Sequence, residues 1–410
     1  MASQNERFKV SVCDLVTSFG GVQRVMVNLL PELARQFEIQ VVDPYANPEY
    51  RRSLERLGIG CRFGEQVFRK PYIGGRCPSG RAVKLLRALP RILKIRSMLA
   101  RAICEIQPHC VYMNQLPVLR LMGSVHADRR IPMIYHAHGF SRPSDIGSLT
   151  VRFINARVGR VIAVSRSTAR ILMEAGIKKE LIEVCYNSVP VEEIERYSKI
   201  PPEKPLPQRP GSGTVFLLPA SIQETKGQHL AIKAMAELEK EGMEASLWLA
   251  GDVPAGGSKE YFEMLHRLVQ DSDLNGHVQF LGWREDMYGV MAAADVVMLC
   301  SKSESFGMAL AEAMVLGKPC IGARIGGMPE VIENEKTGLL FDPGSLESLR
   351  SAMAWLSENR ELRERYGRAG MQKVREMFAV EVQAERVSAI VRDVARPAEK
   401  RMYRNCILHS

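Results

Sequence analysis

The sequence predicts an α/β protein made of two doubly wound, Rossmann-like domains. Its 410 residues exceed the size at which a single hydrophobic core stops growing, so about two domains are expected. Short apolar segments alternate with amphipathic segments of helical length, the order that produces parallel sheets covered by helices. A Pro-rich segment (YSKIPPEKPLPQRPGSG, residues 197–213) separates two such series and is typical of a linker. We therefore expect one domain over residues 1–196 and a second over residues 214–379.

Composition and charge restrict the class of protein. Hydrophobic residues make up 46% of the chain and charged residues 25%, as in ordinary globular domains. No apolar run approaches the roughly 20 residues of a membrane span, and the first residues lack a signal-peptide core, so we expect a cytoplasmic protein. The nine cysteines show no metal-ligand spacing, so we expect no disulfide and no metal site. The net charge of +10 indicates an anionic partner: nucleic acid, acidic lipid or a nucleotide diphosphate.

The first domain begins with a strand at residues 9–14 and a helix after the turn at Gly20 and Gly21. A glycine pair at this point lets backbone amides approach an oxyanion closely, although a plain tight turn has the same pattern. The other strands expected in this domain lie at residues 39–45, 110–114, 132–136, 161–165 and 182–187. His136 and His138 follow one another at the carboxyl end of a strand, where parallel sheets bind ligands. His136 has the simpler explanation of a strand residue.

Residues 62–101 carry a run of basic residues and a single acid, Glu65. Helical spacing places Lys84, Arg87, Arg91, Lys94 and Arg101 on one face, and Val83, Leu86, Leu89, Leu93 and Leu99 largely on another. Pro90 allows for a kink or for two shorter helices. Such a helix can lie on an anionic membrane, and a core helix with a solvated basic face explains the pattern equally well. Without interleaved aromatic residues, a nucleic acid partner is not expected.

The second domain repeats the strand and helix pattern. Strands are expected at residues 215–218, 246–251 and 277–282, and helices at 261–269, within 346–378 and at 380–394. Lys226 and Gly227 precede an amphipathic helix after the first of these strands. Asp271 and Asp273 have the spacing of a metal-dependent transferase, but they follow a helix, so a capped helix end is the better explanation.

Residues 295–330 contain a strand, a polar loop, a helix and another strand. The apolar run 296–299 predicts a strand buried on both faces. Residues 308–316 are rich in helix formers and end before Gly317 and Pro319. The loop between them therefore lies at the carboxyl edge of a parallel sheet, where α/β folds bind ligands.

Two carboxylates, Glu304 and Glu312, frame this loop. If the helix begins near Phe306, both can face one ligand from opposite ends, roughly 10–12 Å apart at the helical rise. The amides of Ser305, Phe306 and Gly307 are then expected as unpaired helix-start donors for hydroxyl or phosphate oxygens.

The segments ESFGMALAEA and GKPCIGARIGGMPEVI resemble the donor-site motif of the family-4 retaining glycosyltransferases of the GT-B fold. The glutamate pair, the SFG turn, the Gly-Lys-Pro stop and the GG-x-x-E turn occur in the family's order. The resemblance extends over nearly the whole chain and is strongest over residues 219–343. It implies two Rossmann-like domains facing a cleft, with residues 380–410 packing back on the first domain.

The resemblance also implies an activity, that of a glycosyltransferase (EC 2.4). It implies retaining transfer of a sugar from a nucleotide-diphosphate sugar, a UDP- or GDP-sugar co-substrate, with no metal and no other cofactor. Glu304, with the amides of the following turn, would hold the sugar and steady its cationic transition state. The other implied roles are diphosphate binding by Lys226, ribose binding by Glu312, sugar contact by His138, phosphate or acceptor contact near Gly20 and Gly21, and nucleobase contact at Gly282.

Two positions depart from the family's pattern. Relatives carry an arginine five residues before the lysine, where this chain has Ser221, so one cation of the diphosphate clamp is missing. Such a charge-assisted bond is worth about 1.5–3 kcal/mol, and Arg166 or Arg284 could compensate. The family's Asn-Gly turn is Asn187-Ser188 here.

The sequence leaves the acceptor open. The basic region favours a lipid-linked or polysaccharide intermediate of cell-envelope, lipopolysaccharide or exopolysaccharide biosynthesis, with peripheral attachment to the inner face of the membrane. The alternatives are a soluble small-molecule acceptor and, because of Ser221, a donor-binding protein with a relic catalytic site. A non-hydrolysing sugar-nucleotide epimerase shares the fold, but the glutamate pair and the SFG turn speak against it.

Overall fold

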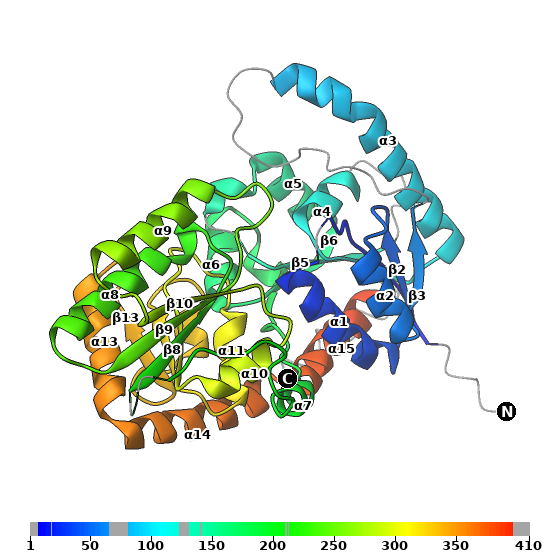
Figure 1. The fold of residues 1–410 in the computed structure, drawn as a ribbon. Helices are drawn as coiled ribbons and strands as arrows, with labels where there is room; N and C mark the ends of the chain where they lie inside the picture. The colour runs from blue at the N-terminus through cyan, green and yellow to red at the C-terminus, as the bar shows by residue number, and fades with distance from the viewer. Residues whose placement is uncertain are drawn as a thin grey trace. The chain divides into compact units, whose positions relative to one another are not determined.

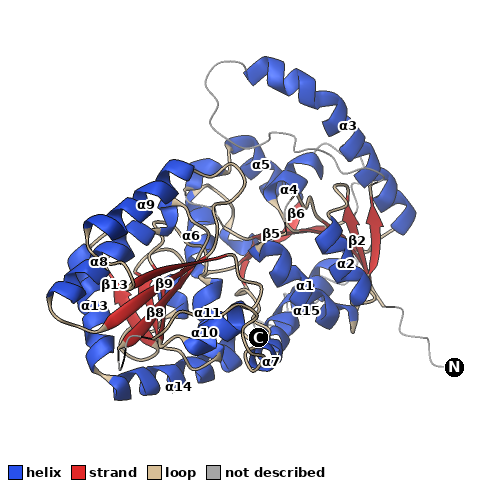
Figure 2. Ribbon diagram, viewed as in Figure 1, coloured by secondary structure: helices blue, strands red, loops and turns tan. Residues whose placement is uncertain are grey.

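The computed structural model describes residues 7–17, 19–64, 81–122 (side chains from 89), 131–139, 142–209, 211 and 213–396. The chain divides into two compact units, Met1–Ser188 with Val380–Ser410, and Val189–Ala379. Each unit contains one parallel sheet flanked by helices (Figures 1 and 2). The predicted fold class, α/β with two Rossmann-like domains, is confirmed.

The sheet of the first unit has seven parallel strands in the order β3-β2-β1-β4-β5-β6-β7. Their bounds are β1 Lys9–Cys13, β2 Glu38–Asp43, β3 Gly60–Phe63, β4 Cys110–Met113, β5 Met133–Ala137, β6 Val158–Ala163 and β7 Ile182–Val184. Val12 pairs with Val41 on one side and with Tyr112 on the other. The strand order changes direction between β1 and β4, so the topological switch point, where such sheets bind ligands, lies between these two strands.

Helices cover both faces of this sheet. They are α1 Gly21–Ala34, α2 Pro48–Arg56, α3 Arg81–Ile106, α4 Leu116–Met122, α5 Ser148–Arg157, α6 Arg166–Glu174 and α15 Val380–Ala395, with short 3₁₀ turns η1 Pro143–Asp145 and η2 Lys179–Leu181. Successive strand residues point to opposite faces, so Cys110 joins the core under α1 and α15, whereas Val111 joins the core under α3 and α4. Burial on both faces explains why these strands are continuous apolar runs.

The sheet of the second unit has six parallel strands in the order β10-β9-β8-β11-β12-β13. Their bounds are β8 Thr214–Pro219, β9 Ala245–Ala250, β10 Val278–Gly282, β11 Val296–Leu299, β12 Cys320–Ala323 and β13 Gly338–Phe341. The helices are α7 Val191–Tyr197, η3 Glu224–Lys226, α8 Gln228–Lys240, α9 Lys259–Asp271, α10 Met287–Ala293, α11 Met308–Val315, α12 Met328–Val331, α13 Leu346–Glu358 and α14 Arg360–Met377. The switch point of this sheet lies between β8 and β11.

The first crossing between the units follows Ser188, whereas we expected the first domain to extend to residue 196. The amide of Val189 donates to the carbonyl of Phe378 over 2.8 Å. Helix α7 packs on α10 and α11. Residues 189–197 are thereby attached to the second unit, together with the Pro-rich segment that follows them.

Helix α3 is a single helix that contains Pro90. From Ile95 onward its apolar residues, Leu99 among them, are buried in the core of the first unit, whereas Leu89 and Leu93 are 45% and 51% exposed. Figure 1 shows its N-terminal half extending away from the sheet of this unit. Several basic residues of the predicted run lie outside the residues, or the side chains, that the structure describes: Arg69, Lys70, Arg76, Arg81, Lys84 and Arg87. Within the described chain, no helix is both long and apolar enough to cross a membrane.

Three glycines contact the backbone of the segment that leads from β11 to Glu304. Gly326 adopts φ +58°, and a Cβ there would lie 1.8 Å from the carbonyl oxygen of Glu304. The amide of Gly327 donates to the same oxygen over 3.0 Å. A Cβ at Gly227, φ +72°, would lie 2.2 Å from the carbonyl oxygen of Cys300. The GG-x-x-E turn is therefore required to hold the loop by backbone contact.

We expect Gly326→Ala to lower the free energy of unfolding by about 3 kcal/mol, since the left-handed conformation costs about 1–2 kcal/mol and overpacking adds at least about 1 kcal/mol. Gly344→Ala is the matched control, because Gly344 has φ +77° but a Cβ there meets nothing within 4 Å. Denaturation followed by circular dichroism measures both variants. Equal losses would show that the contact with Glu304 carries no weight.

Candidate active site

The loops that follow β8 and β11 meet at the switch point of the second sheet. Lys226 is the last residue of η3, and Glu304 lies in the loop before α11. Lys226 Nζ and Glu304 Oε2 form an ion pair at 2.9 Å, with side chains 27% and 20% exposed. The structure thus brings two of the predicted catalytic residues into direct contact at a position that solvent reaches.

A second ion pair joins the same two loops, with its lysine on the loop after β11 and its glutamate on the loop after β8. Lys302 Nζ lies 2.8 Å from Glu224 Oε1, and both side chains are more than half exposed. The amide of Lys302 also donates to the carbonyl of Thr225 over 2.8 Å. Sequence reasoning missed Lys302, although a lone lysine among the serines before Glu304 was visible. It is a second cation on the loop that carries Glu304.

Ser221, at the position where the family's pattern has an arginine, is hydrogen-bonded within its own loop. The Ser221 hydroxyl accepts a hydrogen bond from Gln223 Nε2 over 2.7 Å. Arg284 is 5% exposed and donates to both carboxylate oxygens of Asp286, at 2.7 and 2.6 Å, and to the carbonyl of Lys204. The suggestion that Arg284 compensates for Ser221 is therefore wrong, because the Arg284 guanidinium is buried and already forms an ion pair with Asp286. Arg166, the other residue suggested, belongs to the first unit.

Helix α11 begins at Met308, where the run of helix formers predicted it, and Gly307 at φ +100° serves as its N-cap. The start near Phe306, assumed for the spacing of Glu304 and Glu312, is two residues too early. The first helix amides are those of Met308 and Ala309, while Ser305, Phe306 and Gly307 lie in the preceding loop. The Phe306 ring is buried, and its centroid lies 5.2 Å from that of the Phe378 ring, so Phe306 can offer a ligand only its backbone. Glu312 is half-buried one turn into the helix.

The predicted nucleobase edge ends at Gly282, which adopts φ +65° and accepts a hydrogen bond from the Gly251 amide over 2.8 Å. The next residue, Trp283, is 55% exposed. An exposed indole at the carboxyl edge of the sheet can stack on a flat ring. No periodic pattern in the sequence pointed to Trp283, and we add it to the candidate site.

In the first unit, polar side chains stand at the carboxyl ends of adjacent strands. Asn114, after β4, donates from Nδ2 to Asp14 Oδ2, after β1, over 2.9 Å. The Oδ1 of Asn114 lies 2.6 Å from His138 Nε2, after β5. Asp43, at the end of β2, accepts hydrogen bonds from the amides of Val16 and Tyr45.

Burial shifts the titration of these groups. It raises the pKa of Asp14 to about 7, with the nearby Asp43 charge adding to the rise while the Asn114 and Leu15 hydrogen bonds oppose it. Burial lowers the pKa of His138 to about 3, so the imidazole is neutral near pH 7. His136 is buried in β5 and its Nδ1 lies 2.7 Å from the Tyr112 hydroxyl, which makes it a strand residue as expected.

The turn at Gly20 and Gly21 opens α1, with the Gly20 amide donating to Gln23 Oε1 over 3.2 Å. A Cβ at Gly21 would meet nothing within 4 Å. Packing against the described residues therefore does not require glycine at this position. Gly20, Gly21 and His138 belong to the first unit, and the other predicted site residues to the second.

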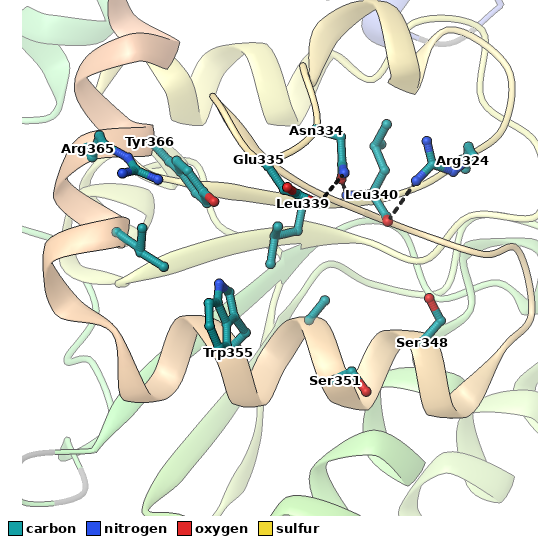
Figure 3. Close-up of a pocket in the computed structure, with 12 residues that line it drawn as sticks. Arg324, Asn334, Glu335, Leu339, Leu340, Ser348, Ser351, Trp355, Arg365 and Tyr366 are labelled. Atoms are coloured by element: carbon teal, nitrogen blue, oxygen red, sulfur yellow. Dashed lines mark hydrogen bonds between the residues drawn. The ribbon is translucent and has the colours of Figure 1, made fainter.

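A pocket of about 670 Å³ lies elsewhere in the second unit, between β13, α13 and α14 (Figure 3). Trp355, Arg365 and Tyr366 are among its lining residues, and none of the predicted site residues is. Among the described residues, no three His, Cys, Asp or Glu side chains are grouped so that they could hold a metal ion.

Comparison with known families gives two matches. The family model described as Glycosyltransferase Family 4 matches residues 19–193, and the one described as Glycosyl transferases group 1 matches residues 202–373. The chain is 26% identical over 366 residues to the lipopolysaccharide core biosynthesis glycosyltransferase LpsD of Rhizobium meliloti, covering 88% of this chain and 91% of the relative. It is 33% identical over 177 residues to N-acetyl-alpha-D-glucosaminyl L-malate synthase of Bacillus anthracis, but covers only 45% of that protein and 43% of this chain.

Solved structures show the same fold. Anabaena HepE, in complex with UDP and glucose, aligns with a TM-score of 0.76 at 22% identity, covering 94% of this chain and 99% of that one. A glycosyltransferase of Rickettsia africae aligns with a TM-score of 0.78 at 17% identity, covering 96% and 100%. Since the two family models match successive stretches of the chain, and the fold agrees, the chain belongs to the family-4 (group 1) glycosyltransferases of the GT-B fold.

Proposed function

We propose that this glycosyltransferase moves a sugar from a nucleotide-diphosphate sugar to its acceptor with retained anomeric configuration and without a metal ion. The observation that carries the proposal is the ion pair of Lys226 and Glu304 at the switch point of the second sheet. A cation for the leaving diphosphate and an acid for the sugar are thereby held side by side.

Donor binding rearranges this ion pair. The diphosphate carries about two negative charges and attracts Lys226 Nζ away from Glu304. Glu304 then accepts hydrogen bonds from sugar hydroxyls, and its charge stabilises the cationic sugar of the transition state. The Met308 and Ala309 amides at the start of α11 add donors for oxygen atoms, and Glu312 holds the ribose.

A uridine nucleotide is the donor class with most support. The HepE structures contain UDP and UDP-glucose, and Trp283 stands where a nucleobase would stack beside Gly282. From the first unit, His138 would contact the sugar, and the turn at Gly20 and Gly21 the phosphate or acceptor. The departing phosphate takes the acceptor's proton, so no separate general base is needed.

The acceptor that we propose is a lipid-linked or polysaccharide intermediate of envelope biosynthesis, with attachment of the enzyme to the membrane surface. The similarity to LpsD supports the pathway class. On α3, the exposed Leu89 and Leu93 stand beside the exposed Arg91, a basic and apolar combination suited to an anionic bilayer. The second candidate function, a donor-binding protein with a relic site, is favoured only by Ser221.

Lys226→Ala and Glu304→Ala should each lower turnover on the order of 10²–10³, because each removes a charge aimed at the transition state. Thermal unfolding should hardly change, since a pair this exposed contributes about 0–1 kcal/mol. Release of nucleotide from a panel of UDP- and GDP-sugars measures turnover, and NMR of the product gives its anomeric configuration. If the unmodified protein releases nucleotide from none of these donors, the result would favour a donor-binding protein with a relic catalytic site.

Two controls accompany these variants. Lys336→Ala removes an exposed ion pair with Glu333 in the same unit and should leave turnover unchanged. The double variant Lys226→Glu with Glu304→Lys can re-form an ion pair with the charges exchanged. If the pair only held the two loops together, the exchange would restore turnover. We expect no recovery.

Membrane attachment predicts that the double variant Arg91→Glu with Leu93→Ser binds anionic vesicles about tenfold more weakly, because each surface cation contributes about 1 kcal/mol and a buried leucine adds to it. Co-sedimentation with phosphatidylglycerol vesicles at low salt measures binding. Arg360→Glu, on the 83% exposed Arg360 of α14, makes the same charge change elsewhere. Equal binding by the unmodified protein to phosphatidylcholine vesicles, or none to either, would contradict the proposal.

A further inference from the structure

Three side chains form a hydrogen-bonded chain across the switch point of the first sheet. Asp14, Asn114 and His138 come from the ends of β1, β4 and β5, which are neighbours in that order. Asp14 and Asn114 are both 0% exposed. The two contacts, 2.9 Å from Asn114 Nδ2 to Asp14 Oδ2 and 2.6 Å from Asn114 Oδ1 to His138 Nε2, are short; the first is buried and the second partly buried.

The chemistry of each group sets the direction of the chain. An ionised carboxylate only accepts hydrogen bonds, so Asn114 must turn its Nδ2 toward Asp14 and its Oδ1 toward His138. An amide oxygen also only accepts, so His138 Nε2 must carry the hydrogen. The other oxygen of Asp14, Oδ1, accepts from the Leu15 amide over 2.8 Å, which fixes the carboxylate in place.

This direction leaves His138 Nδ1 as an acceptor. Nδ1 is buried and has no hydrogen-bond partner among the described residues, and the same is true of Asn187 Oδ1. Asn187 raises the pKa of His138, against the larger effect of burial, because its oxygen could accept from a protonated Nδ1. In the neutral ring Nδ1 can only accept a hydrogen bond, so its donor is either the Asn187 amide, turned so that Nδ2 faces the ring, or a hydroxyl group of a ligand. A ligand that brings a hydroxyl donor satisfies this end of the chain.

We propose that Asp14 and Asn114 are positioning residues that hold His138 as the Nε2–H tautomer and so present its Nδ1 to a hydroxyl group of the bound sugar. The identity of the ligand rests on the proposed function, whereas the tautomer is a property of the protein alone. A chain that served only packing would place no requirement on the tautomer.

Asp14→Asn tests the direction of the chain. The Leu15 amide still requires an acceptor, so the new amide places its oxygen there and its NH₂ toward Asn114. Asn114 must then reverse, present its NH₂ to His138 Nε2 and leave the hydrogen on Nδ1. We expect the Nε2–H tautomer in the unmodified protein and the Nδ1–H tautomer in the variant.

The measurement is long-range ¹H–¹⁵N NMR of histidine-labelled full-length protein at pH 8.5, above the pKa of about 7 to which burial raises Asp14. Loss of a signal in His138→Gln assigns the ring. Asp43→Asn is the matched control, since it removes a neighbouring buried carboxylate that does not contact Asn114, and it should leave the tautomer unchanged. Asn114→Leu removes the hydrogen bonds that connect Asp14 to His138 and should give a mixture of tautomers. It provides the test if Asp14→Asn fails to fold.

With a UDP-sugar that the enzyme turns over, Asp14→Asn should lower kcat/KM about tenfold, the effect of one hydrogen bond. An Nδ1–H tautomer in the unmodified protein, or an unchanged tautomer in both Asp14→Asn and Asn114→Leu, would overturn the inference even if turnover is normal. If NMR shows the expected tautomers but no donor is turned over, the inference about positioning is supported and the proposed function fails.

Discussion

The constraint on which the rest of the structure depends is the reversal of strand order in each parallel sheet. At a reversal the loops of two adjacent strands leave in opposite directions, and the carboxyl ends between them are left uncovered. In the first unit the reversal lies between β1 and β4, and in the second between β8 and β11. At each of them a pair of polar side chains spans the gap: Asp14 with Asn114 in the first unit, and Lys226 with Glu304 in the second. The same topology has been given two different kinds of polar contact.

The two contacts differ in how easily a ligand can change them. The pair of Lys226 and Glu304 is partly exposed, and ion pairs of that kind contribute about 0–1 kcal/mol, so a diphosphate can displace the carboxylate. Asp14 and Asn114 are buried, where an unmet hydrogen bond costs about 1–3 kcal/mol, so their arrangement is fixed before any ligand arrives. On the proposed function, the Lys226–Glu304 pair can rearrange around the departing diphosphate. The fixed Asp14–Asn114 contact can instead hold a side chain that recognises the sugar.

The sequence alone was sufficient for most of the strands, although β3 and β13 were not among those predicted. Strands buried on both faces are continuous apolar runs, which is why β1, β5 and β11 were predicted with nearly their observed bounds. His138, Lys226 and Glu304 were found because they follow such strands. Contacts between loops far apart in the chain were not predictable: Asn114 and Asp14 are 100 residues apart. The left-handed conformation of Gly307 before α11, and the hydrogen bond of Arg284 to the Lys204 carbonyl in the linker, were not predictable either.

Ser221 changes the balance of charge at the donor site rather than only weakening it. Without the family's arginine, the two loops carry Lys226 and Lys302, each matched by a glutamate of the opposite loop. The four charges sum to zero, so the empty loops do not hold a strong positive field for other phosphates. A diphosphate alone gains Lys226 but leaves Glu304 without a partner, next to its own negative charge. A diphosphate that carries a sugar supplies hydroxyl donors for Glu304 at the same moment. On the proposed function, the loss of the arginine would therefore favour the complete donor over the free nucleotide, because only the complete donor satisfies both members of the pair.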